Sequence, residues 1–154
     1  MIDYSKFKPA LMKLGKDQEE QILTKESILA LHKVAIDIAG GELTVRDENL
    51  LDSVSVTPYQ CIFGEDLYPT LFDKAAKFLF DFCHYQIFVD GNKRTGVLTM
   101  QSLLELNGYD INLTNEEVYD LAMDIANNRI NEIPDISNIL KEKCTLKDEM
   151  EVER

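Results

Sequence analysis

Stretches with apolar residues at helical spacing alternate along the chain with short polar interruptions, and this alternation predicts a helical protein. The first clear stretch follows Thr24, a residue type that caps helix N-termini, and it stops at Gly40-Gly41. Two denser apolar stretches, residues 71–82 and 97–106, predict helices buried on most of their surface. Further helices are predicted over residues 48–54, from Thr114 to about Asn127, and from about Asp135.

Polar residues at two predicted helix starts support these boundaries. Thr114-x-x-Glu117 is a capping box, and Thr70-x-x-Asp73 resembles one with Asp in place of the usual Glu. Residues 57–69 contain two prolines and a glycine, which predicts an irregular loop with at most a short β-hairpin. The pattern therefore predicts an all-α fold, an orthogonal helical bundle.

A length of 154 residues fits one domain with a sizeable core. We expect residues 24–142 to form that domain. The weakly periodic residues 1–23 are expected to form an N-terminal arm or a short helix. The largely charged residues 143–154 have no apolar stripe, and we interpret them as a tail without a fixed structure.

Charge and cysteine content narrow the function classes. The formal net charge of −12 argues against a surface built for nucleic acid, but it does not exclude a small cationic pocket. The apolar stretches are too short to cross a membrane, and the first residues lack the pattern of a signal peptide. Three cysteines without paired metal spacing are typical of free thiols, so we expect a cytoplasmic protein.

The candidate chemistry lies in one polar loop between the two most apolar helices, Asp90-Gly91-Asn92, followed by Lys93-Arg94. A helix N-terminus attracts phosphate through free N–H groups and the helix dipole, and the two cations strengthen that attraction. Gly91 permits close backbone approach, and Asn92 has the chemistry of a helix cap. Asp90 supplies the hard oxygen ligand that Mg²⁺ prefers. The same residues also suit an ordinary turn, so the loop alone leaves both interpretations open.

The segment Ile87-Phe88-Val89-Asp90-Gly91-Asn92-Lys93-Arg94-Thr95-Gly96 closely resembles the motif of the Fic/Doc family, in its death-on-curing form. That motif reads His-Pro-Phe, any residue, Asp, Gly or Ala, then Asn-Lys-Arg-Thr. Similarity to the family continues outside the loop, in Gly40-Gly41, in residues 45–53 with their Arg-Asp and Leu-Leu-x-Ser pattern, and in residues 103–109. The resemblance covers roughly residues 24–142 and implies the helical bundle of that family.

The resemblance also implies a function. Family members transfer a phosphate or part of a nucleotide to a hydroxyl of a target protein, with ATP or another nucleoside triphosphate as co-substrate and Mg²⁺ bound through its phosphates. Lys93 favours the Doc branch, and Val97 stands where nucleotide-transferring members have a second Arg. In that branch the known target type is elongation factor Tu, and a separate antitoxin protein controls the toxin. The roles implied are metal binding for Asp90, phosphate binding for Gly91, Asn92, Lys93 and Arg94, and anchoring of the loop for Phe88.

The family's general base is a His two residues before the Phe, and here that position is Gln86, followed by Ile87 in place of Pro. Gln has no titratable group and does not accept a proton. His84 is the nearest histidine. Two residues turn a helix by about 200°, so on a continuous helix His84 faces away from Gln86. We therefore interpret His84 as a helix-end residue and keep it as a weaker candidate base. His32, inside the first long helix, is interpreted as structural or exposed.

Two interpretations follow. The first is a Doc-like toxin that transfers phosphate or nucleotide, with weak activity. The second is a catalytically impaired homologue that binds a nucleotide or a protein. Thr44-x-x-x-Glu48-Asn49 also fits a self-inhibitory pattern of some Fic proteins, and we interpret that match as a coincidence.

Overall fold

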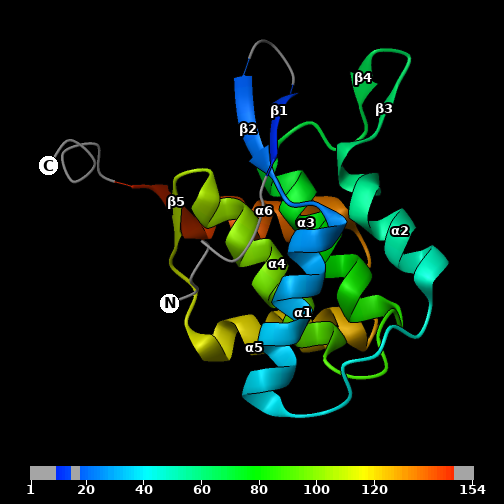
Figure 1. The fold of residues 1–154 in the computed structure, drawn as a ribbon. Coiled ribbons are helices and arrows are strands. Elements are labelled where there is room, and N and C mark those ends of the chain that lie inside the picture. Colours follow the sequence, from blue (N-terminus) through cyan, green and yellow to red (C-terminus); the bar gives the residue numbers. More distant parts are fainter. Residues whose placement is uncertain (1–9, 15–17, 148–154) are drawn as a thin grey trace, which may run out of the picture.

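The protein was analysed as a computed structural model that describes residues 10–14 and 18–147. Over these residues six α-helices carry the fold, and the strands are short (Figure 1). The all-α prediction is confirmed. The helices are α1 (Lys25–Ala39), α2 (Glu48–Val56), α3 (Leu71–His84), α4 (Asn92–Leu106), α5 (Asn115–Ala126) and α6 (Ile133–Lys143), with a 3₁₀ turn at Thr57–Tyr59. None of the described helices is long and apolar enough to cross a membrane.

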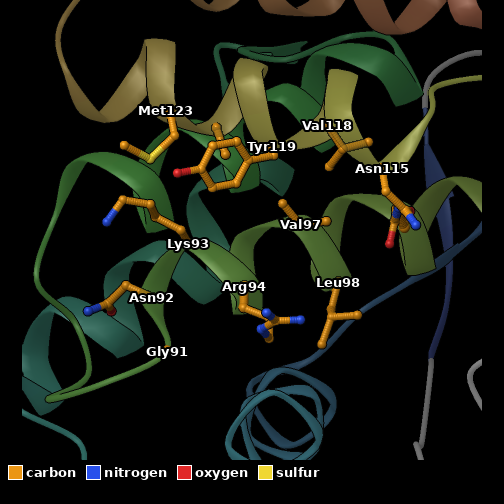
Figure 2. A pocket seen from close by; sticks show the side chains of 12 residues that line it. Gly91, Asn92, Lys93, Arg94, Val97, Leu98, Asn115, Val118, Tyr119 and Met123 are labelled. Atoms are coloured by element: carbon orange, nitrogen blue, oxygen red, sulfur yellow. The ribbon is translucent and has the colours of Figure 1, made fainter. Parts of the chain in front are cut away.

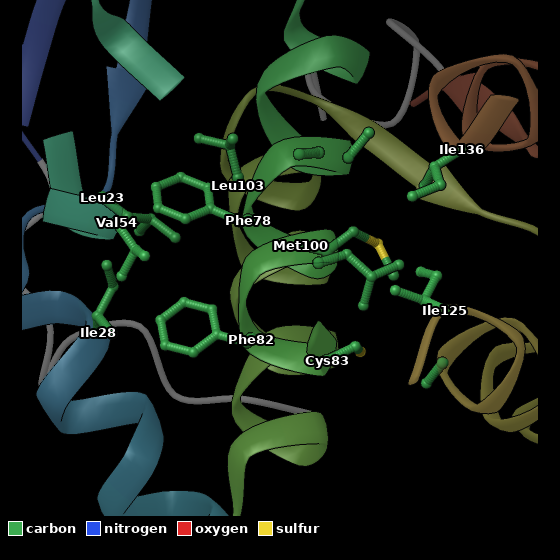
Figure 3. Packing of buried hydrophobic residues seen from close by; sticks show 14 of the residues in the cluster. Leu23, Ile28, Val54, Phe78, Phe82, Cys83, Met100, Leu103, Ile125 and Ile136 are labelled. Carbon is green, nitrogen blue, oxygen red and sulfur yellow. The ribbon is translucent and has the colours of Figure 1, made fainter. Parts of the chain in front are cut away.

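Helices α3 and α4 form the centre of the bundle as an antiparallel hairpin, and the other helices pack around them. Phe78 and Phe82 of α3 face the core together with Met100 and Leu103 of α4, as Figure 3 shows. Gly96 permits the close approach at the loop end, because a Cβ there would lie 2.8 Å from the Cβ of Phe82. The apolar density that predicted two buried helices therefore reflects a hairpin enclosed by its neighbours.

Local capping sets several of the helix boundaries. The Thr24 side chain accepts from the Ser27 N–H, and Thr70 and Thr114 form capping boxes with Asp73 and Glu117. The predictions at these three positions are confirmed. Helix α1 ends at Gly40, whose φ of +81° is accessible to glycine at little cost.

The strands form three antiparallel pairs at the periphery: β1 (Ala10–Leu14) with β2 (Gln18–Ile22), β3 (Cys61–Ile62) with β4 (Glu65–Asp66), and β5 (Tyr109–Ile111) with β6 (Cys144–Leu146). The pair β3–β4 is the hairpin predicted in the loop before α3. The other two pairs were not predicted.

The strands β1, β2 and β6 change two predictions about the ends of the chain. The described part of the N-terminal segment is a β-hairpin rather than a helix, and it leads to Leu23, which is fully buried. The Asn107 side chain holds this hairpin by bonding both the N–H and the C=O of Gln21 at 2.8 Å. After α6 the chain continues as β6, with Cys144 paired to Ile111. Residues 148–154, the rest of the predicted tail, lie outside the described part of the chain.

Candidate functional site

The site is built on the loop between α3 and α4, which lies between α1 and the extended residues 44–47. Main-chain hydrogen bonds join this loop to the extended segment: Val89 N–H donates to the Thr44 carbonyl at 3.0 Å, and the Arg46 N–H donates to the Ile87 carbonyl at 2.9 Å. Val45 and Phe88 form an isolated antiparallel bridge. The Arg-Asp segment recognised in the sequence therefore supports the loop through its main chain.

Phe88 lies in the core, with no exposed surface. Its ring stacks on His32 of α1, with centroids 3.6 Å apart and planes inclined by 6°, and also lies parallel to Phe82 at 6.0 Å. The loop thus has an aromatic anchor between α1 and α3. This is the position that the resemblance implies for Phe88.

Asn92 stabilises the loop from the inside. Its Oδ1 accepts from the N–H groups of Phe88 at 2.8 Å and Ile87 at 3.2 Å, while its Nδ2 donates to the Phe88 carbonyl at 2.9 Å. The residue is 8% exposed. The prediction that Asn92 caps α4 is wrong, because its side chain turns back into the loop and Gly91 occupies the cap position.

The start of α4 consequently has no side-chain cap. Gly91 adopts a left-handed conformation with φ of +83° and ψ of 19°, which turns the chain sharply into the helix. The first N–H groups of any α-helix lack partners within the helix and carry its partial positive charge. At this helix they lie beside the cavity described below, so they are suited to bind an anion.

Asp90 is held at both its main-chain and side-chain oxygens. His32 Nε2 lies 2.8 Å from the Asp90 carbonyl oxygen, and the Glu42 N–H donates to Asp90 Oδ2 at 2.8 Å. Gly41 permits this contact, because a Cβ there would lie 2.8 Å from the Asp90 Cβ. The Gly-Gly pair that ends α1 therefore also accommodates the candidate metal ligand.

Lys93 and Arg94 line a cavity of about 650 Å³ between α4 and α5 (Figure 2). Gly91 and Asn92 line the same cavity. The remaining wall is largely apolar and is formed by side chains of both helices: Val97, Leu98, Val118, Tyr119, Ala122 and Met123. In Figure 2, Met123 and Tyr119 lie near Lys93, and Leu98 lies near Arg94. One cavity thus brings two cations together with apolar side chains. The sequence reasoning missed the α5 side of this wall, since only the fold brings it to the loop.

The structure places Gln86 beside Asn92 and His84 at the end of α3. Gln86 is exposed, and its Oε1 accepts from Asn92 Nδ2 at 3.3 Å. The ring of His84 stacks on Phe80 at 5.0 Å and meets Tyr85 edge-on at 4.7 Å. The helical angle argument does not apply to this pair, because α3 ends at His84 and Tyr85 is extended. The two ring contacts of His84 are with its own neighbours, Phe80 of α3 and Tyr85 just after it, and not with the residues that line the cavity.

The acidic residue of the self-inhibitory pattern, Glu48, has different neighbours from the residues of the α3–α4 loop. Glu48 begins α2, and its carboxylate lies 3.4 Å from Lys25 Nζ at the first residue of α1. The contacts of α1 with the loop come from His32 and Ile36, two turns or more along that helix. The interpretation of the pattern as a coincidence stays a prediction.

His32 is the residue of the site that sequence reasoning undervalued. It is 1% exposed, and burial lowers the pKa of its imidazole below the usual value, although the nearby Asp90 opposes that shift. A signal was available in its spacing, because Ile28, Leu31 and Ala35 place it on the buried face of α1. Its partner lies 58 residues away, which spacing does not reveal.

A helical hairpin that presents an uncapped, cationic helix start to a cavity defines this chain as a helical protein with a candidate anion site. Comparison with known proteins identifies the family: residues 22–104 match the model of the Fic/DOC family. The chain is also similar to "Toxin Doc" of Mycolicibacterium smegmatis, with 35% identity over 113 residues that cover 73% of this chain and 80% of the relative. The protein therefore belongs to the Fic/DOC family.

Proposed function

We propose that this protein is a toxin-like member of its family that binds a nucleoside triphosphate with Mg²⁺ at the start of α4. The observation that carries the proposal is one cavity lined both by Gly91, Asn92, Lys93 and Arg94 at the start of α4 and by apolar side chains of α4 and α5. The start of α4 suits the phosphates, because Arg and Lys side chains and free helix N–H groups are common phosphate ligands. The apolar wall between α4 and α5 suits a nucleobase.

Asp90, which precedes the cavity-lining Gly91 but does not itself line the cavity, is the carboxylate that we propose for magnesium. Among the described residues, no group of three His, Cys, Asp or Glu side chains is arranged to hold a metal. Mg²⁺ in nucleotide sites is commonly held by one or two carboxylates together with the phosphates, so a single carboxylate is sufficient. Asp90 Oδ2 is engaged by the Glu42 N–H, which orients the carboxylate. Bound there, the metal would neutralise charge on the phosphates.

In this proposal, different residues account for phosphate binding and for proton transfer. Lys93 and Arg94 line the cavity, which supports a role for them in holding phosphates, while Gln86 at the base position has no titratable group. A missing general base typically lowers a rate by about 10²–10⁴-fold without removing binding. Transfer of phosphate or nucleotide to a protein hydroxyl, at a weak rate, is therefore our first proposal, and an antitoxin partner accompanies it because the named relative is a toxin.

A second candidate function is nucleotide or protein binding without transfer. It is favoured by one observation, the hydrogen bond from Asn92 Nδ2 to Gln86 Oε1. That bond fixes the orientation of the Gln86 amide, whose oxygen and NH₂ group are a hydrogen-bond acceptor and donor but not a base. A donor at this position binds an oxygen but does not remove a proton.

Calorimetric titration with Mg²⁺ and ATP tests the nucleotide site. We expect binding by the wild type and a loss of about tenfold or more in affinity for Lys93→Ala or Arg94→Ala, because each removes a charge-assisted hydrogen bond to phosphate. Lys141→Ala, which removes an exposed cation on α6, is the matched control and should bind normally. Absence of binding at millimolar nucleotide contradicts the proposal.

Incubation with radiolabelled ATP and a bacterial lysate separates the two candidate functions. Transfer predicts a labelled protein band with the wild type, and a stronger band after Gln86→His. The binding module predicts no band with the wild type. If the wild type labels a protein and His84→Ala abolishes the band, His84 is the base in spite of its contacts with Phe80 and Tyr85.

A further inference from the structure

His32 makes contacts that core packing alone does not explain. It is a polar residue with 1% exposure on the buried face of α1, which is apolar apart from Ser27 and His32 itself. Both its ring and its Nε2 contact the loop. Its ring stacks on Phe88 at 3.6 Å, and its Nε2 lies 2.8 Å from the Asp90 carbonyl oxygen. These contacts lie on either side of Val89, so one side chain holds both ends of the turn that enters the phosphate-binding segment.

The direction of the hydrogen bond follows from its partner. A main-chain carbonyl oxygen only accepts, so the Nε2 atom must carry the proton and donate it. The imidazole also lies against the next residue: the space that a Cβ on Gly91 would occupy is 3.6 Å from His32 Nε2 and 3.1 Å from Ile36 Cδ1. The residue that caps α4 therefore lies beside the same ring that contacts Asp90.

We infer that His32 is a positioning residue of the nucleotide site, which sets the main chain of Asp90 and Gly91 and thereby fixes where the first N–H groups of α4 lie at the cavity. The inference rests on the proposed nucleotide site for its functional consequence. The imidazole acts through the loop and does not touch the ligand. The role combines two separable parts, a ring that stacks on Phe88 and an N–H that fixes Asp90.

Two substitutions separate these parts. His32→Phe keeps a ring that stacks on Phe88 but removes the donor, and His32→Gln keeps an N–H at similar reach but removes the ring. Loss of one hydrogen bond that fixes the loop predicts an affinity for Mg²⁺–ATP about three- to tenfold weaker in His32→Phe. In His32→Gln we expect most of the affinity to return, which is rescue by the donor.

The control is Ile28→Val, which shortens a buried side chain on the same face of α1 without touching the loop. Every affinity is measured well below the melting temperature of each variant, so that all of the protein is folded. A merely structural role for His32 would lower stability in the variants, as in Ile28→Val, and leave the affinity of the folded protein unchanged. Equal affinity of wild type and His32→Phe therefore overturns the inference.

A second measurement, made without nucleotide, tests the positioning itself. Amide hydrogen exchange is followed by NMR at Phe88 and Val89, whose N–H groups bond to Asn92 Oδ1 and the Thr44 carbonyl. We expect faster exchange at both amides in His32→Phe, with partial recovery in His32→Gln and no change inside α3. Unchanged exchange in His32→Phe refutes the inference. A wild type that fails to bind ATP contradicts the proposed function, and the exchange data still decide the role of His32.

Discussion

Replacing Asn92 by alanine is the sharpest test of how the loop is stabilised. The substitution removes the acceptor of two main-chain N–H groups, those of Ile87 and Phe88, and the donor to the Phe88 carbonyl. Ile87 and Phe88 are fully buried, so water does not replace the lost hydrogen-bond partners. The loop is then left with three unsatisfied main-chain groups.

The magnitude follows from these bonds. A buried group left without its partner costs about 1–3 kcal/mol, and the bond at 3.2 Å is the weakest of the three. Allowing for partial relaxation of the loop, we expect the free energy of unfolding to fall by about 3 kcal/mol. For a domain of this size that loss lowers the melting temperature by roughly 6–12 °C.

Urea unfolding followed by circular dichroism measures the loss, with the slope of the transition showing whether the denatured state has changed. Asn115→Ala is the matched control, because Asn115 is an exposed amide that lines the same cavity, and its loss should stay within about 0.5 kcal/mol. If Asn92→Ala loses less than about 1 kcal/mol, the loop does not depend on this amide, and our account of its stabilisation is wrong.

Two further predictions concern the end of α1 and the thiols. Gly41→Ala should cost about 1–3 kcal/mol more than Gly40→Ala and weaken the Mg²⁺ dependence of ATP binding, because both glycines have positive φ but only a Cβ at Gly41 meets Asp90. Equal losses of stability for the two variants in thermal unfolding, or an equal Mg²⁺ dependence in nucleotide titration, would contradict this. At pH 8, a thiol reagent with mass-spectrometric readout should label the exposed Cys61 at once and Cys83 only on unfolding. The reason is that burial shields the Cys83 thiol and raises its pKa to about 12. Rapid labelling of Cys83 in the native protein would refute its burial.

The helices were predictable because their signals are local. A capping box such as Thr114-x-x-Glu117 is complete within four residues, and the structure shows both of its hydrogen bonds. The strands had no comparable signal. In β5–β6, Tyr109 pairs with Leu146, and α5 and α6 lie between the two strands in the sequence. Pairing across that separation is a property of the fold, so the sequence pattern missed it.

In the site, too, the residues that are close in the sequence were predictable and the distant contacts were not. The residues of the loop were recognised because they are consecutive in the sequence, but the groups that hold them come from elsewhere. His32 and the Glu42 N–H reach Asp90 across 58 and 48 residues. Asn92 shows a second limit: an Asn before a helix has the same sequence signature whether it caps the helix or turns back into the loop. Only the observed bonds to the loop distinguish the two.

These contacts bear on the proposed separation of phosphate binding from proton transfer. Gln86 is exposed and is bonded to Asn92 at 3.3 Å, whereas the loop is held by Asn92, Phe88 and His32 through shorter and more buried contacts. We therefore expect a change at position 86 to leave the loop in place. Under the proposed function, Gln86→His then adds a titratable group at the position of the general base, while the affinity for Mg²⁺–ATP stays as in the wild type. A large loss of affinity in Gln86→His would show that the loop depends on residue 86 through its bond to Asn92.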